Sequence, residues 1–199
     1  MKNYYLITFV VLLTANVALS QSGWFSQSSN TSNNLNSVYF IDSYTGFTAG
    51  NAGIIHKTTD GGRNWNSVNS GISSNLYAIC FTLPANGIAC GSSGIILRTT
   101  NGGNIWTTVS SGTTIELKSI SFSDVNNGWI CGSGGVLLKT INGGNNWSPQ
   151  NSGLSSDLNS IYFIDSQIQA VSRRFYRNKI NGATQINIRI KIKRALTGI

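Results

Sequence analysis

Charged side chains are scarce in this sequence: Asp, Glu, Lys and Arg together make up only 10% of its 199 residues. Long surface helices usually carry many Glu, Lys and Arg residues, so the composition argues against a helical protein. Histidine occurs once and cysteine three times, without a Cys-x-x-Cys pair, which argues against a zinc site. We therefore expect no metal and no cofactor. Gly, Ser, Thr and Asn are abundant instead, as is typical of turn-rich β-structure.

The N-terminus carries the pattern of an export signal. Lys2 precedes an apolar run of about a dozen residues, Leu6–Leu19, and Ala18–Ser20 forms a small-x-small cleavage pattern. The run falls short of the roughly 20 residues that span a membrane, and no cysteine follows it for lipid attachment. We predict a signal peptide over residues 1–20 and export to the periplasm, the cell surface or the medium. No integral membrane segment is expected after the signal is removed.

The rest of the chain is dominated by a repeat of 41 residues. Three copies begin at Leu35, Leu76 and Leu117, and Leu158–Ser166 matches Leu35–Ser43 at eight of nine positions. Such a period predicts a stacked or radial repeat architecture. The predicted units are a repeat region over 21–166, with full blades at 35–75, 76–116 and 117–157 and the first strand of a fourth, and a basic degenerate tail over 167–199.

Hydrophobic residues alternate within each copy, as they do in half-buried strands. The positions of Val38 and Phe40 are apolar in every copy, with mostly small or polar residues between them. A second segment ends at Gly50, a Gly-containing turn follows, and a third segment leads into a motif that ends in tryptophan. Four short antiparallel strands in about 41 residues make one propeller blade. The sequence therefore predicts an all-β fold, a β-propeller or propeller fragment of four-stranded blades.

The cysteines fit this repeat. Cys90 and Cys131 fill the position that Ala49 has in the first copy, which favours a small buried residue over chemistry. The pairing of Cys80, Cys90 and Cys131 is left open, because an odd number leaves at least one thiol free or paired between chains.

The motif before the fourth strand reads Thr-Thr-Asp-Gly-Gly-Arg-Asn-Trp in the first copy and recurs in both others. A catalytic site is normally needed once, whereas a structural joint is needed in every copy. The hydroxyl and the carboxylate or amide can hydrogen-bond the turn's own backbone, the glycines allow unusual backbone angles, and the tryptophan can bury a large ring. We expect the three tryptophans to be buried at equivalent places. The predicted structural residues are Thr58, Asp60, Gly61, Gly62, Trp65, Thr99, Asn101, Gly102, Gly103, Trp106, Thr140, Asn142, Gly143, Gly144 and Trp147.

With these residues in register, the motif resembles the Asp-box, or BNR, repeat of sialidases, sortilin-like receptors and some glycoside hydrolases. The longer pattern Gly-x-x-Gly-x-Ile-x-x-Thr-Thr-Asp-Gly-Gly-x-x-Trp most resembles the photosystem II stability/assembly-factor-like repeats, over about Trp24–Ser166. Asn101 and Asn142 replace the Asp of the box in two copies, but Asn also caps turns. The resemblance implies a β-propeller that works as a protein-interaction or assembly scaffold, and it does not imply photosynthesis.

We expect the interaction surface on one face of the propeller. It would be built from the turns between the second and third strands, at Asn51–Gly53, Ser92–Gly94 and Ser133–Gly135. A protein partner is expected and polysaccharide is left open as a second partner class. An exported protein rarely meets nucleic acid, so no nucleic-acid partner is expected.

The enzymes among the Asp-box proteins raise the alternative of a carbohydrate-binding or glycoside hydrolase-like protein. Glycoside cleavage usually needs two carboxylates across a cleft, and this chain has six acidic residues in total. By repeat position they are three turn caps, one box residue and two solvated loop residues: Asp42, Asp124 and Asp165; Asp60; Glu116 and Asp157. His56 fills a slot that is leucine in the other copies, which favours packing. We therefore predict no enzyme, although exposed aromatics clustered on one face, such as Tyr44 or Tyr77, would favour sugar binding.

The ends of the repeat region leave the number of blades open. Trp24–Ser29 looks like a fourth strand without its blade and is expected to close the last one. The repeat fails after Ser166, and eight of the fourteen basic residues fall between Arg173 and Arg194. A frameshift in the coding sequence explains both changes; the alternative is a native tail in which Ile186–Lys193 pairs as an edge strand. A third possibility is that the chain is a fragment of a larger multi-blade protein.

Overall fold

The structure is a computed structural model that describes residues 26–163, 175–180 and 183–188, and these residues form strands and turns without an α-helix. Three single 3-10 turns, η1 Asn51–Gly53, η2 Ser92–Gly94 and η3 Ser133–Gly135, are the only helical elements among them. The strands are β1 Leu35–Phe40, β2 Gly46–Gly50, β3 Ile55–Thr58 and β4 Asn66–Val68; β5 Leu76–Leu83, β6 Asn86–Gly91, β7 Ile96–Thr99 and β8 Thr107–Val109; β9 Leu117–Phe122, β10 Gly128–Gly132, β11 Leu137–Thr140 and β12 Ser148–Pro149; and β13 Phe175–Ile180 and β14 Ala183–Ile188. The predicted all-β class is confirmed.

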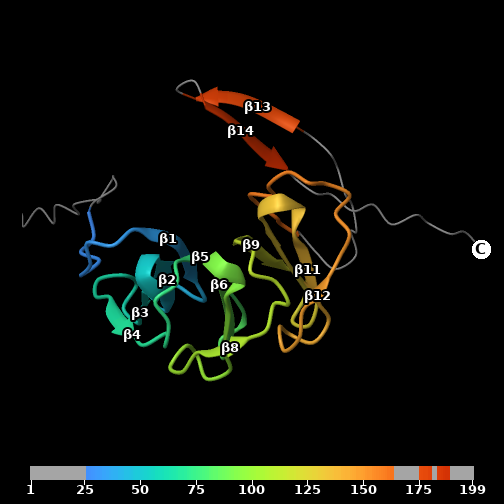
Figure 1. Cartoon of the computed structure of the whole chain (residues 1–199). Coiled ribbons are helices and arrows are strands. Elements are labelled where there is room, and N and C mark those ends of the chain that lie inside the picture. Colours follow the sequence, from blue (N-terminus) through green and yellow to red (C-terminus); the bar gives the residue numbers. More distant parts are fainter. Residues whose placement is uncertain (1–25, 164–174, 181–182, 189–199) are drawn as a thin grey trace, which may run out of the picture.

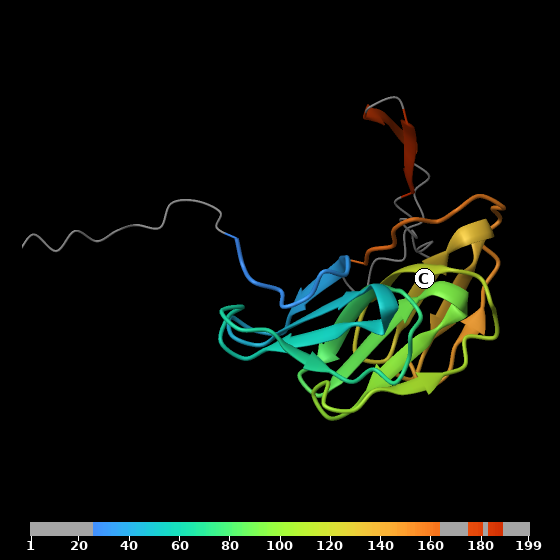
Figure 2. The same ribbon diagram turned by 60° about the vertical axis from the view of Figure 1, so that its left-hand side comes forward.

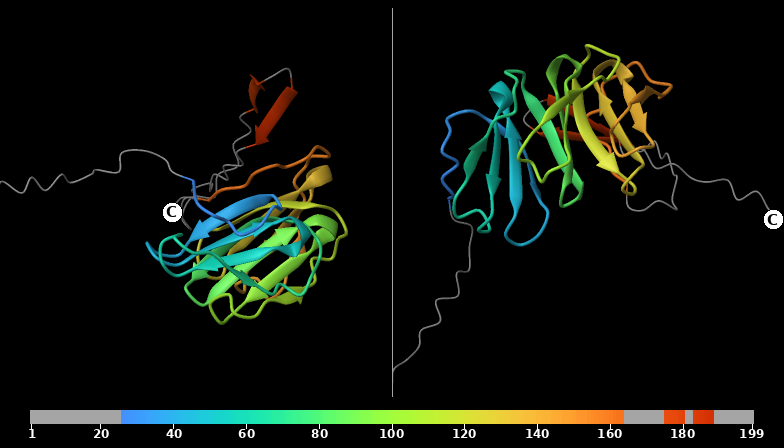
Figure 3. Two further views of the ribbon diagram at one scale, coloured as in Figure 1. Left: turned by 90° about the vertical axis from the view of Figure 1, so that its left-hand side faces the viewer. Right: turned by 90° about the horizontal axis from the view of Figure 1, so that it is seen from below.

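The first twelve strands form three four-stranded antiparallel sheets, each made of four consecutive strands in sequence order. We call them blade 1 (β1–β4), blade 2 (β5–β8) and blade 3 (β9–β12). The blades pack face to face in chain order (Figure 1), one behind another in Figure 2 and side by side in the right-hand view of Figure 3. Within the described ranges they form an open arc and not a closed ring, which confirms the predicted propeller or propeller fragment. Strands β13 and β14 form a separate two-stranded sheet.

Strand alternation creates the core between blades. In blade 1, Ala49 pairs with Ile55 and Phe47 lies two residues away, so the three side chains share one face. This face packs against the facing side of blade 2, including Ala89 and Leu97, in one buried cluster. The same contact recurs between blades 2 and 3. Because blade 2 is covered on both sides by its neighbours, its inner strand β6 is almost entirely buried.

The cysteines lie in these interfaces as packing residues. Cys90 and Cys131 are fully buried, as is Ala49 at the equivalent position. All three thiols are free, and burial raises the pKa of Cys80 and of Cys131 to about 12. A thiol with such a pKa is not a nucleophile at neutral pH.

Polar contacts repeat across the blade interfaces. The Lys57 ammonium donates to the carbonyl oxygen of Gly102 (2.9 Å), and the Arg98 Nε–H donates to the equivalent carbonyl of Gly143 (3.1 Å). Blades 1 and 2 are thereby each tied to the box of the blade that follows. The repeat thus fixes the relation between neighbouring blades as well as the fold of each one.

Only two of the three box tryptophans are buried as predicted. Trp106 and Trp147 keep 6% and 8% of their surface exposed. Trp65 is partly exposed, and Val38 and Phe40 in blade 1 are 61% and 44% exposed. The reason is that a box tryptophan is covered by the preceding blade, and no described residues form a blade before blade 1. The prediction that Trp24–Ser29 closes the last blade rests on Trp24, which lies outside the described residues.

The fourth unit is present as one extended segment. Residues Leu158–Phe163 lie against blade 3 in the place that β5 occupies against blade 1, with Leu158 and Ile161 buried. They are not assigned as a strand, because no strand among the described residues pairs with them. The predicted signal peptide and most of the predicted tail lie outside the described residues, so the boundaries of the units remain predictions.

Candidate interaction face

Each box is a closed hydrogen-bonded turn. The Thr58 hydroxyl donates to the Asp60 carboxylate (2.8 Å) and accepts from the Gly62 N–H (2.9 Å). The carboxylate also accepts from the Asn64 N–H (2.9 Å). The other two boxes repeat this pattern with an asparagine oxygen in place of the carboxylate, through Thr99, Asn101 and Gly103 and through Thr140, Asn142 and Gly144. The hydroxyl and the acid or amide therefore satisfy the backbone of the turn.

The two glycines of a box have different tasks. Both have positive φ, with Gly102 at 69° and Gly103 at 77°. A Cβ on Gly103 would also lie 2.3 Å from the Phe47 ring of blade 1, and one on Gly144 would lie 2.5 Å from Ile88 of blade 2. The second glycine thus lets the core of the preceding blade approach the turn. These contacts support the prediction that the box is a structural joint within and between blades.

Replacement of Asp60 by asparagine is expected to leave the unfolding midpoint at neutral pH nearly unchanged, because Asn101 and Asn142 already hold the same turn. Hydrogen bonds from Asn64, first its backbone N–H and then its side chain, lower the pKa of Asp60 to about 2. A lowered pKa stabilises the fold above the unfolded value of 3.8, and the contribution is lost as the pH falls toward 2. Urea unfolding followed by tryptophan fluorescence at pH 7 and pH 3 should therefore show a flatter pH dependence for Asp60→Asn. A large loss of stability at pH 7 would contradict this assignment.

The opposite end of each blade carries the η turns that the sequence singled out. We call this end the turn face. It comprises η1–η3, the first residues of β1, β5 and β9 with the residues just before them, and the equivalent residues 157–159. The backbone carbonyls of Asn34, Asn75 and Glu116 accept from the first N–H of the η turn in the same blade, at 2.8–3.0 Å. The Asn75 side chain also accepts from the Ala52 N–H of the preceding blade (3.0 Å). Ala52 has φ +56°, so this bond holds a turn that an L-residue rarely adopts.

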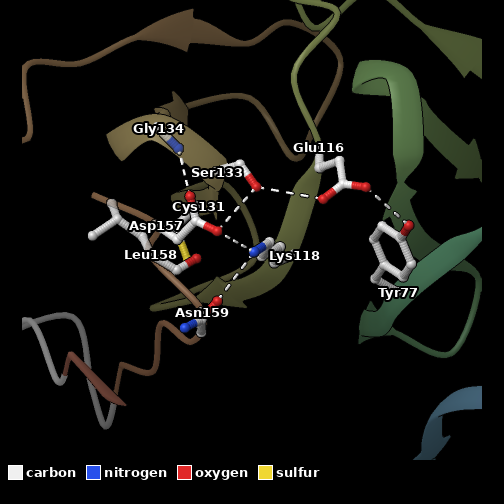
Figure 4. A network of polar contacts seen from close by, with 9 residues as sticks. All are labelled: Tyr77, Glu116, Lys118, Cys131, Ser133, Gly134, Asp157, Leu158 and Asn159. Carbon is white, nitrogen blue, oxygen red and sulfur yellow. Dashed lines mark hydrogen bonds and ion pairs between the residues drawn. The ribbon is translucent and has the colours of Figure 1, made fainter. Parts of the chain in front are cut away.

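A charged network lies on the turn face between blades 2 and 3 and the fourth unit (Figure 4). The Lys118 ammonium donates to Asp157 (2.6 Å) and to the Asn159 side chain (3.2 Å). The Ser133 hydroxyl lies 3.4 Å from the carboxylates of both Glu116 and Asp157. Tyr77 OH donates to the far oxygen of Glu116 (3.3 Å), as Figure 4 shows. Three repeat units are thus joined by side chains.

The environment of Asp157 keeps it ionised. The hydrogen bond from Lys118 is the largest cause that lowers its pKa, followed by the hydrogen bond from the Gly134 N–H. The network therefore presents the ionised carboxylate of Asp157 at neutral pH.

Charge is confined to this junction of the turn face. The loop position of Glu116 and Asp157 is asparagine in the two earlier copies, Asn34 and Asn75. The sequence predicted these two acids as solvated loop residues; they are exposed, but hydrogen bonds also connect them. The signal that could have revealed the network is Lys118, which stands where the other copies have Asn or Tyr.

The remaining acids do not form a catalytic pair in the described residues. Asp42 and Asp124 each accept two backbone N–H groups of their own turn at 2.7–2.9 Å, and Asp165 lies outside the described residues. The pKa of Asp42 is lowered chiefly by these backbone hydrogen bonds. For Asp124, desolvation is the largest single effect and raises the pKa, but the hydrogen bonds of Asn127, Asn126 and Ser123 together lower it. A glycosidase needs a carboxyl whose pKa is raised so that it can act as the acid. The pKa values are instead lowered in Asp42, Asp60, Asp124 and Asp157, which is the opposite of what a general acid needs.

The two tyrosines that would favour sugar binding lie at opposite ends of the blades. Tyr44 is exposed beside a box, where its carbonyl accepts from the Gly61 N–H (2.9 Å), whereas Tyr77 is part of the turn face. His56 is 4% exposed within blade 1; burial lowers its pKa, and a hydrogen bond with the backbone of Ser29 acts the other way. No three His, Cys, Asp or Glu side chains of the described chain gather as metal ligands. None of its helices is long and apolar enough to span a membrane.

Comparison with known proteins agrees with the architecture. Residues 63–159 match the family model described as photosynthesis system II assembly factor YCF48, which confirms the resemblance seen in the repeats. No match was found among the curated proteins. A solved structure described as YCF48 bound to D1 peptide is 23% identical with a TM-score of 0.54, over 61% of this chain and 42% of that one.

Two further solved structures extend this comparison. YCF48 from Cyanidioschyzon merolae is 23% identical with a TM-score of 0.54, over 72% of this chain and 48% of that one. An ancestral GH74 enzyme is 23% identical with a TM-score of 0.50, over 60% of this chain and 19% of that one. At these identities the similarity shows the fold alone. The chain spans less than half the length of either YCF48 structure.

Proposed function

We propose that this chain is an exported, non-enzymatic propeller module that binds a protein partner through its turn face. The observation that carries the proposal is the charged network of Glu116, Lys118 and Asp157 at one blade junction. The polar side chains of the boxes, at the other end of the blades, bond to the backbone of their own turns. The network instead holds charged side chains at the surface. The proposed partner carries charged and hydrogen-bonding groups that complement them.

The network suits binding better than stabilisation. Lys118 and Asp157 form an ion pair whose side chains are 24% and 51% exposed. Exposed pairs of this kind contribute little to stability, because water and salt screen them. Hydrogen bonds to Ser133 and Tyr77 nevertheless orient both carboxylates before a partner arrives. Such preorganisation lowers the entropy that binding costs.

Several observations support the other parts of the proposal. The family model is that of an assembly factor, and one similar structure is described as bound to a peptide, which supports a polypeptide partner. The lowered pKa values of the aspartates support a non-enzymatic role. The pattern of residues 1–20 supports export. The open arc and the part-length match support the hypothesis that these blades belong to a larger propeller.

Site-specific photo-cross-linking tests the location of the binding face. Two exposed isoleucines are suitable positions. Ile115 follows blade 2 and adjoins Glu116 on the turn face, whereas Ile105 belongs to the box of blade 2. A photoreactive phenylalanine analogue at Ile115 is expected to cross-link a discrete envelope protein that mass spectrometry can identify. The same analogue at Ile105 is the matched control and should give little of that product.

Cross-linking with the purified partner then shows whether its capture at Ile115 is specific. Lys118→Ala in the Ile115 probe should lower the cross-linked yield several-fold while the unfolding midpoint stays the same. Equal yields from Ile115 and Ile105, or a yield unaffected by Lys118→Ala, would contradict binding at the turn face.

A further inference from the structure

Five large apolar side chains are exposed at the end of the blades where the boxes lie. They keep 44–69% of their surface exposed: Tyr44, Leu83, Ile105, Val125 and Ile141. Three of them lie in or beside the turn between the first and second strands of a blade, and the other two lie in boxes. We call these five side chains the apolar tips. On the turn face, by comparison, Ile115 is the one large apolar side chain of the described residues that is exposed.

Hydrogen bonds bring the two kinds of turn together at this end. In each blade, the N–H of the first box glycine donates to a carbonyl oxygen of the turn between the first and second strands. The three bonds, 2.9–3.0 Å long, run from Gly61 to Tyr44, from Gly102 to Ala85 and from Gly143 to Asn126. Neighbouring boxes also adjoin, because Lys57 and Arg98 each donate to the box of the next blade. The apolar tips therefore belong to one surface that crosses all three blades.

The repeat indicates that the fold does not require apolar residues at these positions. The position of Ile105 is asparagine in both other copies, and the position of Ile141 is threonine in both. The other three tips each have a polar counterpart in at least one copy: Asp42 for Leu83, Ser43 for Val125 and Asn126 for Tyr44. Each blade nevertheless carries at least one apolar tip. Exposed apolar residues that the fold can do without, gathered at one end, point to a contact outside the chain.

The apolar tips are separated from one another by polar residues. Ile141, for example, lies between Thr140 and Asn142. A protein interface is built around a closely packed apolar core, which separate loop tips do not supply. The interfacial region of a bilayer instead takes up each side chain separately and hydrogen-bonds with the polar groups beside it. Tyr44 adds an amphipathic ring of the kind enriched at membrane–water interfaces, so the chemistry of this end favours a lipid surface.

Acidic and basic residues are nearly balanced at this end. The three acids each bond to the backbone of their own turn: Asp42, Asp60 and Asp124. The four basic residues are Lys57, Arg63, Arg98 and Lys139. Insertion of apolar side chains, and not attraction between charges, therefore has to provide most of the binding to lipid.

We propose that the box end of the blades is a peripheral membrane-contact surface, in which the apolar tips insert into the interfacial region of a lipid bilayer. The contact requires no rearrangement of the blades, because the tips are already exposed. The turn face is then directed away from the lipid, since it lies at the opposite end of the blades. The membrane contact is independent of the proposed function, which concerns the turn face.

Vesicle sedimentation with the full mature chain tests the proposal. The vesicles are of phosphatidylcholine, which carries no net charge, so the basic residues between Arg173 and Arg194 add little attraction. The wild-type chain is expected to sediment with the lipid. A triple variant with residues of the sister copies, Ile105→Asn, Val125→Ser and Ile141→Thr, should lower the partition coefficient at least about tenfold. Ile115→Asn on the turn face is the matched control and should leave the partition coefficient unchanged.

A fluorophore attached at single positions gives a second measurement. Burial raises the pKa of all three native thiols, to about 12 for Cys80 and Cys131, so a cysteine introduced at an exposed position reacts selectively. An environment-sensitive label on Ile141→Cys is expected to emit at shorter wavelength when phosphatidylcholine vesicles are added. The same label on Ile115→Cys should keep the emission of the lipid-free chain.

Three results would overturn the proposal. The first is a wild-type chain that does not sediment with the vesicles, or a correctly folded triple variant that sediments equally well. The second is a label that shifts as much at Ile115 as at Ile141, because the contact would then not be confined to the box end. The third is failure to bind lipid together with cross-linking of an envelope protein from a photoreactive residue at Ile141, which would assign the apolar tips to a protein partner.

Discussion

Replacing Trp106 by alanine is expected to lower the free energy of unfolding by about 3–5 kcal/mol. The ring is buried between blades 1 and 2, where it meets Phe81 edge-on with centroids 6.0 Å apart. Its removal leaves a large cavity that the surrounding strands cannot fill, because they are held by pairing on both sides. Urea unfolding monitored by circular dichroism measures the change.

Trp65→Ala is the matched control for this experiment. Trp65 occupies the same box position and meets Phe40 edge-on with ring centroids 5.9 Å apart, but both residues are partly exposed. The loss of stability should be clearly smaller, since a partly exposed ring leaves a smaller cavity. Equal losses at Trp65 and Trp106 would contradict the interpretation that the preceding blade covers the box tryptophan.

Gly91→Ala is expected to destabilise the chain by about 3 kcal/mol or more, or to prevent folding. Gly91 has φ −170°, which any residue adopts, so backbone conformation is not the reason for glycine. A Cβ there would lie 1.9 Å from the Asn75 carbonyl oxygen and 2.9 Å from the Leu76 Cα. Both atoms are backbone, so the clash can be relieved only by moving β5 away from β6.

Gly112→Ala separates this clash from the general cost of replacing glycine. Gly112 has φ +72°, and a Cβ on it would meet no neighbouring atom within 4 Å, so only the left-handed conformation is penalised. Its substitution should cost about 1 kcal/mol in thermal or urea unfolding. If Gly91→Ala cost no more than Gly112→Ala, close approach of the first and second strands would not explain the glycine.

The sequence predicted what the repeat imposes on every copy. The apolar alternation at Val38 and Phe40 and the glycine at the end of the second strand, Gly50, are local features of a blade. The strands, turns and fold class could therefore be predicted from the repeat period and the residue types. Departures from the repeat were harder to interpret. Trp65 was expected to be buried, because one copy does not reveal whether a neighbour precedes it.

The charged network was missed for a related reason. Glu116 and Asp157 are 41 residues apart and meet only through Ser133 of the η3 turn. Their contact depends on the distance between successive blades, which no local pattern encodes. The turn face itself was predicted, since η1, η2 and η3 occupy the three turns named from the sequence.

The affinity of the cross-linked partner for two single variants tests our central claim most directly. Lys118→Ala removes the centre of the turn-face network, and Asp60→Asn changes a box at the opposite end of a blade. Isothermal titration calorimetry should show a Kd raised about tenfold or more by Lys118→Ala, as expected when one partner of a charge pair is removed, and a Kd unchanged by Asp60→Asn. Unchanged affinity of Lys118→Ala together with weaker binding of Asp60→Asn would contradict the claim that the boxes hold the fold and the turn face binds the partner.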